Sequence, residues 1–149
     1  MTLKKKIYDH YIQLINGKIK ALQQILADLK ESGANETKST AGDKHETALA
    51  MLQIEQANVR TQLSELLEQR TILERIDPLL FPSSIVVGSL AKTNKGYLFL
   101  SVALGKAVID GEQVIALSQL SPLGKKLMGL NKGEFVEMNG NRYVIENIE

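Results

Sequence analysis

The chain of 149 residues has no cysteine, no tryptophan and only three prolines. Without cysteine it cannot form disulfides, thiolate zinc sites or a cysteine nucleophile. It also lacks any apolar run near the roughly 18 residues that cross a bilayer. Its start, MTLKKKIYDHY, is followed by no apolar signal-peptide core. We therefore expect a soluble, cytoplasmic protein without membrane contact.

The charge of the chain does not indicate which kind of partner it binds. The formal net charge is +1, and the contents of 23% charged and 44% hydrophobic residues are ordinary for a soluble protein. This balance predicts no general attraction to nucleic acid or membrane. The short run Lys4-Lys5-Lys6 is interpreted as a solvated N-terminus rather than a phosphate-binding patch. No catalytic triad, phosphate loop or metalloprotease signature is found, so we expect no self-contained catalytic site and no enzyme.

The first half of the chain has the period of a coiled coil. Two proline-free stretches carry mainly apolar residues at alternating spacings of four and three, which indicates two helices packed along a seam. The seam positions are Tyr8, Ile12, Ile15, Ile19, Leu22, Leu26 and Leu29, then Leu49, Leu52, Gln56, Val59, Leu63, Leu66, Arg70 and Leu73. Gln56 and Arg70 are polar interruptions of this seam.

The two helices are predicted to form an antiparallel hairpin over residues 1–77, with its tip near residues 32–47. Gly33 suits a helix C-cap, although the helix could resume through residues 35–40. The second arm, from Lys44 to Ile76, would be about 50 Å long at 1.5 Å per residue. Asp77-Pro78 ends it, because a residue before proline is driven away from helical geometry.

Residues 78–149 change to the short runs of a β-rich domain. The runs SSIVVGSL, GYLFLSVA, KAVI, EQVIALS, EFVEM and NRYVIENI are β-branched or aromatic and lie between turn signals. Asp110-Gly111 and Asn139-Gly140 predict two-residue hairpin turns, and residues 94–96 a third hairpin with a longer connection. Ser121 and Pro122 begin a predicted short helix that Gly129 closes. We expect an α+β protein whose antiparallel sheet packs on this helix.

An acidic pair occupies the predicted hairpin tip, in the stretch STAGDKHETALAM. Asp43 directly before a helix, with Glu46 three residues on, is a capping box that also complements the helix dipole. The same spacing can place both carboxylates on one side of a helix, about 5–6 Å apart at their β-carbons, as ligands for a hard cation such as Mg²⁺. The residues alone leave both interpretations open. His45 is not expected to bind zinc, because the only other histidine is His10 on the other arm.

Two motifs carry a resemblance to a known family. Residues 42–48, Gly-Asp-Lys-His-Glu-Thr-Ala, resemble the Gly-Asp-x-x-Glu-Asn-Ala segment at the hairpin tip of the GreA/GreB transcript cleavage factors. Residues 117–136, LSQLSPLGKKLMGLNKGEFV, look like that family's Ser-Pro, short helix, glycine and Gly-acid strand. The helical hairpin followed by a β-rich domain is similar as well. The resemblance implies that residues 78–149 form an FKBP-like domain.

The resemblance also implies a function in transcription elongation. The hairpin would enter the secondary channel of bacterial RNA polymerase, where Asp43 and Glu46 would help hold a Mg²⁺ ion and its attacking water in the polymerase active site. Both acids would be metal ligands only within that complex, and the chain would have no cofactor of its own. Lys44, His45 and Thr47 would contact the polymerase, and contact with nascent RNA would be indirect.

The C-terminal motif implies a second contact with the polymerase. In this interpretation Ser121 and Pro122 face the polymerase rim at the channel mouth. The sequence departs from the family at several positions: Lys44 replaces an apolar residue, Ile54 an arginine and Leu120 an acid. His45 and Thr47 likewise stand where serine and asparagine are usual.

Three alternatives remain open, and the departures at Lys44 and Ile54 favour the first of them. The first is a channel-binding regulator that stimulates no cleavage. The second is a coiled-coil adapter whose hairpin mediates weak self-association. The third is a prolyl isomerase, which an FKBP-like fold would allow. Its pocket needs clustered aromatic residues, and the chain has only three phenylalanines and no tryptophan.

Overall fold

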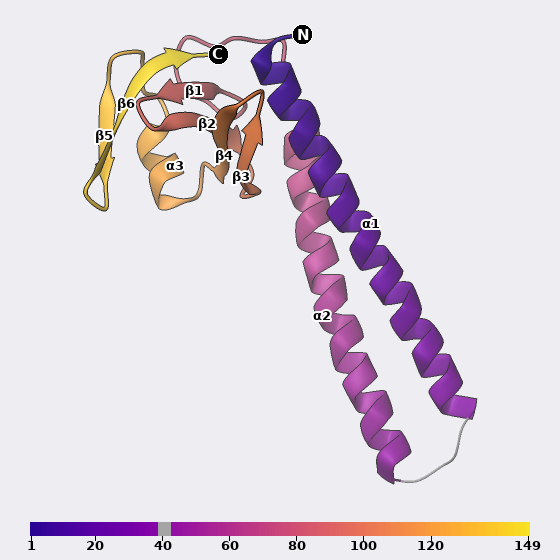
Figure 1. Ribbon diagram of the computed structural model, residues 1–149. Helices are drawn as coiled ribbons and strands as arrows, with labels where there is room; N and C mark the ends of the chain where they lie inside the picture. The colour runs from indigo at the N-terminus through magenta and orange to yellow at the C-terminus, as the bar shows by residue number, and fades with distance from the viewer. Residues whose placement is uncertain (39–42) are drawn as a thin grey trace. The chain divides into compact units, whose positions relative to one another are not determined.

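The computed structural model describes the backbone of residues 1–38 and 43–149 and the side chains of residues 1–34 and 46–149. Two long helices, α1 (Leu3–Lys38) and α2 (Asp43–Glu74), precede a six-stranded sheet and a short helix, α3 (Pro122–Leu127). The strands are β1 (Leu90–Thr93), β2 (Gly96–Ser101), β3 (Gly105–Ile109), β4 (Glu112–Ser118), β5 (Phe135–Met138) and β6 (Asn141–Ile148) (Figure 1). The predicted α+β class is confirmed.

The chain divides into two compact units. One contains residues 14–70, which are the greater parts of α1 and α2, and the other contains residues 1–13 together with residues 71–149. This division differs from the predicted boundary after residue 77. The first turns of α1 pack with the strands, as Tyr11 shows by its contact with Phe99, so both ends of the helical segment belong to the unit that holds the sheet.

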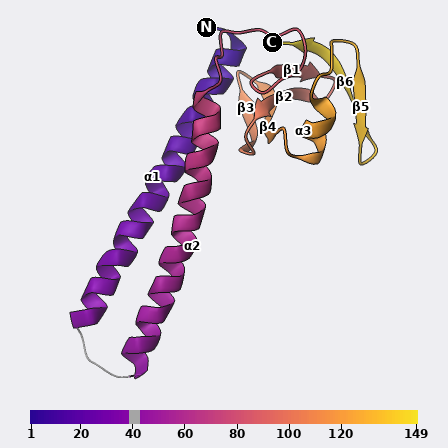
Figure 2. The ribbon, with the colours of Figure 1, turned by 180° about the vertical axis from the view of Figure 1, so that it is seen from behind.

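Within residues 14–70 the two helices run side by side (Figures 1 and 2). Every predicted seam position of α2 is at least half-buried, and Val59 is buried, as are Ile15 and Ile19 on α1. The polar interruptions of the seam link the two helices. Gln56 Nε2 donates to the carbonyl oxygen of Leu29 at 3.4 Å, and Arg70 Nη1 donates to Asn16 Oδ1 at 3.3 Å. The predicted seam is therefore confirmed in this unit.

Gly33 does not end α1, so of the two possibilities that the sequence left open, the helix continues past this residue instead of being capped there. The helix continues to Lys38, and α2 begins at Asp43. A glycine inside a helix costs only about 1 kcal/mol relative to alanine, which contacts with a neighbouring helix can offset. The helices thus take up residues 32–38 and 43–47 of the predicted tip.

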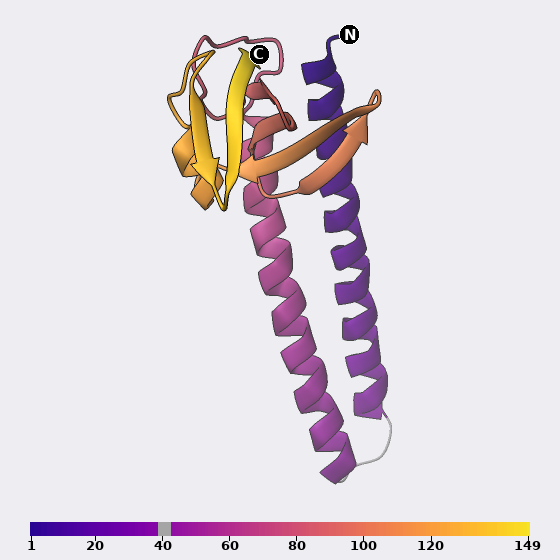
Figure 3. The same cartoon turned by 60° about the vertical axis from the view of Figure 1, so that its left-hand side comes forward.

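The sheet is mixed rather than wholly antiparallel, which corrects the predicted topology. Its strand order is β3-β4-β2-β1-β6-β5, and β2 pairs with β4 in parallel. The reason lies in residues 102–104. After β2 they carry the chain to the sheet edge as β3, and the β3–β4 hairpin then returns β4 beside β2 in the same direction. Figure 3 shows the β3–β4 and β5–β6 hairpins running in clearly different directions, as in a strongly twisted sheet.

The predicted hairpin turns are present. Asp110-Gly111 joins β3 to β4 with φ values of 53° and 77°, and Asn139-Gly140 joins β5 to β6 with 52° and 78°. Two successive positive φ values define the type I′ turn that these dipeptides favour. The third hairpin is tighter than predicted, because Thr93 pairs directly with Gly96.

The run SSIVVGSL, residues 83–90, is not a strand, although its composition predicted one. Ser84 makes a single bridge to Asn131, and the backbone of Ile85 exchanges hydrogen bonds with Leu130 and Gly129 at 2.9 and 2.8 Å. This irregular loop places the Ile85 side chain in the core. The strand begins only at its last residue, as β1.

Strand β2 is buried on both of its faces and therefore contributes to the core on each side of the sheet. Leu98 and Leu100 point into a core that also includes Ile85, Ala91, Leu117, Leu127 and Ile145.

The opposite face of β2 carries Phe99, which is fully buried. Its ring stacks with Tyr11 of α1, with centroids 6.1 Å apart and an interplanar angle of 28°. The Tyr11 hydroxyl donates to the carbonyl oxygen of Gly105 on β3 at 2.8 Å.

We predict that Tyr11→Phe lowers the free energy of unfolding by about 1–2 kcal/mol, since one buried hydrogen bond is lost. Burial raises the pKa of Tyr11 above its usual 10.0. The unfolded chain releases this proton at lower pH than the folded chain does, so the stability due to Tyr11 is complete below about pH 10 and is lost as the pH rises above that value. Urea denaturation of both proteins at about pH 8 and about pH 11 should show the difference shrinking at the higher pH. A difference that is constant with pH would contradict this.

A second prediction concerns the two glycines inside α1. An added Cβ at Gly17 meets nothing within 4 Å, and one at Gly33 meets only the Gln56 side chain at 3.8 Å. Gly17→Ala and Gly33→Ala should each raise the free energy of unfolding by about 0.5–1 kcal/mol. Thermal or urea unfolding measures this. A loss of stability at Gly33 would show that helix α1 ends near that residue after all.

Candidate functional site

The start of α2 brings the predicted tip residues into one helical turn. Helix α2 begins at Asp43, so Asp43 and Glu46 belong to its first turn. The side chain of Glu46 is exposed, as is that of Thr47. The site residues predicted at 43–45 lie, in their side chains, outside the described part of the chain.

The capping and metal-binding interpretations of Asp43 can be compared only by backbone position. A capping box needs Asp43 immediately before the first helical residue, whereas α2 starts at Asp43 itself. The hydrogen bonds of this side chain fall outside the described residues, so the capping role stays a prediction. Either way, two acids in the first turn complement the positive end of the α2 dipole.

The residue types in this turn include possible ligands for a Mg²⁺ ion. Magnesium prefers hard oxygen ligands, keeps several waters and takes one or two carboxylates from a protein. Asp43 and Glu46 supply two such groups, and Glu46 is open to solvent. Elsewhere, among the side chains of residues 1–34 and 46–149, no three acids or histidines gather as a metal site.

Ser121 and Pro122 form the predicted start of α3. The Ser121 hydroxyl accepts from the Gly124 amide at 3.0 Å and donates to the carbonyl oxygen of Ser118 at 2.6 Å. Its donor and one lone pair are thus used inside the domain, which indicates a structural role for Ser121. Pro122 is exposed at the first turn, and the neighbouring Leu120 is 74% exposed. Pro122 and Leu120 are therefore available to a partner at this surface.

Gly124 is a structural requirement of this turn that sequence reasoning missed. A Cβ at this buried position would clash with the carbonyl oxygen of Ser118. The helix can therefore approach the end of β4 this closely only with glycine here. A glycine in the first turn of a predicted helix, where it lowers helix propensity, is the one sequence signal that could have indicated this close approach.

Lys4 is buried, which contradicts the prediction of a solvated lysine run. Its side chain is 1% exposed, and its ammonium donates to the carbonyl oxygen of Leu80 and lies 5.3 Å from the Phe81 ring centroid. Burial lowers the pKa of Lys4, against the opposing charges of Glu149 and Asp77. The sequence could not predict this burial, because the loop of Leu80 and Phe81 that covers Lys4 is far from it along the chain.

The other two lysines of the run remain at the surface. Lys5 pairs with Asp9 and Lys6 with Asp110, each at 2.6 Å. Exposed pairs of this kind contribute about 0–1 kcal/mol. Lys4 is therefore the one lysine of this run that is buried.

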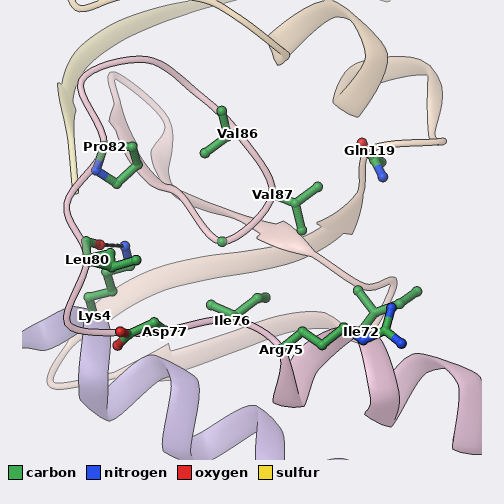
Figure 4. Close-up of a pocket in the computed structure, with 11 residues that line it drawn as sticks. Lys4, Ile72, Arg75, Ile76, Asp77, Leu80, Pro82, Val86, Val87 and Gln119 are labelled. Atoms are coloured by element: carbon green, nitrogen blue, oxygen red, sulfur yellow. Dashed lines mark hydrogen bonds between the residues drawn. The ribbon is translucent and has the colours of Figure 1, made fainter.

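A cavity of about 490 Å³ lies beside Lys4 (Figure 4). Its lining comes from α1, the end of α2, the loop before β1 and the loop after β4. The residues are Lys4, Ile72, Arg75, Ile76, Asp77, Leu80, Pro82, Val86, Val87, Gly88 and Gln119. Since these positions are scattered along the chain, no local motif could have indicated the cavity.

Comparison with known proteins gives few matches. No family model matches the chain, and no curated protein matches it. Among solved structures, that of the transcription factor Gfh1 is similar over 92% of each chain, with 16% sequence identity and a TM-score of 0.37. A likeness of this size does not by itself assign a function. No helix in the described part of the chain is long and apolar enough to cross a membrane.

Loss of the α3 cap should be measurable. We predict that Ser121→Ala lowers the free energy of unfolding by about 1 kcal/mol, whereas Ser121→Asp, which can still accept from Gly124, loses much less. Urea denaturation compares the two variants. Equal losses in both would show that the donor bond to Ser118, rather than the cap, is the important contact.

Proposed function

We propose that the chain is a Gre-like transcription factor that binds bacterial RNA polymerase through the secondary channel. The hairpin of α1 and α2 would bring Asp43 and Glu46 to the polymerase active site and assist Mg²⁺-dependent transcript cleavage. The observation that carries the proposal is that α2 begins at Asp43, which puts both acids in the first turn after the link between the helices.

The dimensions of the helices suit a probe of this kind. Helix α2 has 32 residues and therefore extends about 48 Å at 1.5 Å per residue. Within residues 14–70 its apolar seam faces α1, and the hydrogen bonds of Gln56 and Arg70 join the two. Because the two helices bury their apolar seam residues against each other, they need no further layer of protein around them. A pair of helices without such a layer is thin enough to enter a channel.

The chemistry of the acids supports an accessory role. When bound in the polymerase, Mg²⁺ acidifies its bound water and orients it for attack on a phosphodiester. The chain would add the carboxylates of Asp43 and Glu46 as hard oxygen ligands. Exposure of Glu46 leaves its oxygens accessible to an ion held by a partner. The chain acts in this proposal as a cofactor of the polymerase.

A second candidate, a secondary-channel regulator without cleavage activity, is favoured by the residues around the acids. Lys44 adds a positive charge between Asp43 and Glu46, in the same helical turn, where a cation would have to bind. Ile54, at the position of the family's usual arginine, is 61% exposed and offers an apolar contact instead of a charge. Both candidates share the same docking and differ only in cleavage.

We predict that the chain shortens transcripts in stalled elongation complexes containing Mg²⁺. The double variant Asp43→Asn with Glu46→Gln should lower that activity by about 100-fold or more, since two ligands to the catalytic ion lose their charge. Binding to core polymerase, measured by pull-down, should be unchanged. The matched control is Glu55→Gln with Glu68→Gln, at exposed positions farther along α2, which should keep full activity.

The other outcomes separate the candidates. Binding without cleavage by the unmodified chain, together with competition against a cleavage factor, would select the non-cleaving regulator. Failure to bind core polymerase at all would contradict both candidates and leave a coiled-coil adapter.

A further inference from the structure

Strand β3 forms one edge of the six-stranded sheet, and only one of its sides is paired. The strand order is β3-β4-β2-β1-β6-β5, so β4 is the single neighbour of β3. Figure 3 shows the β3–β4 hairpin extending beyond the other strands. An edge strand presents a row of backbone N–H and C=O groups with which a further extended chain can pair.

The hairpin turn decides which backbone groups of β3 point outward. A two-residue turn makes the residues that flank it a hydrogen-bonded pair, here Ile109 with Glu112. Bonded and non-bonded pairs alternate along an antiparallel ladder, so Ala107 also bonds to β4. Lys106 and Val108 then direct their backbone groups away from β4. In the described part of the chain, neither makes a backbone hydrogen bond outside the sheet.

A groove of about 410 Å³ lies at this edge. Lys106 and Val108 line it together with Ile115 and Gln113, which are their cross-strand partners on β4. Directly paired residues share a face of a sheet, so these four side chains lie on one face. Val108 is 68% exposed although it is apolar. The open strand therefore offers a charged and an apolar position, two residues apart, on one face.

The groove carries positive charge without negative charge beside it. Lys95 and Lys106 both line it and are exposed, and no acidic residue lines it. Among the described side chains, neither lysine forms an ion pair. The two acids of the β3–β4 hairpin are directed elsewhere: Asp110 pairs with Lys6 at 2.6 Å, and Glu112 faces the opposite side of the sheet, as alternation along β4 requires. Complementary charge therefore favours an acidic partner at this edge.

We propose that the β3 edge binds an extended acidic peptide segment of a partner protein, which adds to the sheet as a further strand. The peptide backbone pairs with Lys106 and Val108. One acidic side chain of the peptide lies against the Lys106 ammonium, and an apolar side chain packs on Val108. In an antiparallel pairing the segment therefore has an apolar residue two positions before the acid. This contact does not involve the helices α1 and α2, so a failure of polymerase binding would leave it unaffected.

The test is an amide NMR titration of the full chain with the peptide Ser-Thr-Val-Thr-Glu-Thr-Ser, which has this spacing. At saturation, strand addition should slow hydrogen exchange at the amides of Lys106 and Val108 by about tenfold or more. The amides of Ala107 and Ile109 already bond to β4 and should be unchanged. A charge contact alone would not produce this alternation.

Altered peptides and altered chains check the chemistry of the contact. The peptide Ser-Thr-Val-Glu-Thr-Thr-Ser places its valine and its acid on opposite faces and should bind about threefold to tenfold more weakly. Lys106→Glu should weaken binding of the first peptide by about fivefold to tenfold, because like charges then face each other. Lys132→Glu, at an exposed position in the loop before β5, is the matched control for net charge and should bind as the unmodified chain does.

Three outcomes would overturn the proposal. Absence of saturable binding by the first peptide would leave Lys106 as a charge that keeps the edge strand from pairing. Equal binding of the two peptides would show adsorption on the lysines without strand addition. Slow exchange at Lys106 and Val108 before any peptide is added, if it disappears on dilution, would show that a second copy of the chain occupies this edge.

Discussion

The packing of Tyr11 on Phe99 is the contact on which the arrangement of the sheet unit depends. Phe99 lies on β2, a strand buried on both faces, and a buried strand needs cover on both sides of the sheet. The core with Leu127 covers one side. The first turns of α1 cover the other, and the hydroxyl of Tyr11 also satisfies the carbonyl of Gly105. A segment that the sequence period assigns to a coiled coil thus completes the core of the β-rich unit.

Much of the fold could be predicted because local chemistry decided it. The seam residues show a regular period, and turns such as Asp110-Gly111 need the positive φ values that these residues tolerate. Long-range contacts decided the rest. The run at 83–90 has strand composition, but the backbone amide of Ile85 donates its hydrogen bond to Leu130 instead of to a neighbouring strand. The parallel pairing of β2 with β4 follows from where the β3–β4 hairpin lies, which no local signal records.

The candidate sites also differ in how far local sequence could predict them. The capped turn at Ser121 was predictable because its residue types have one strong local use. The acids of α2 could be placed in a first turn from spacing alone, whereas their function required a resemblance. The cavity beside Lys4 was hidden, because a lysine next to two others in sequence is ordinarily solvated. Only the loop of Leu80 and Phe81 buries it.

The central functional claim is that the start of α2 reaches the metal of the polymerase active site. The most direct measurement replaces the catalytic Mg²⁺ of core polymerase with Fe²⁺, whose hydroxyl radicals cut nearby backbone, and maps the cuts in this chain. The proposed docking predicts cleavage concentrated at residues 43–47. Cleavage elsewhere along the chain, or none in a complex that pull-down shows to be formed, would contradict it.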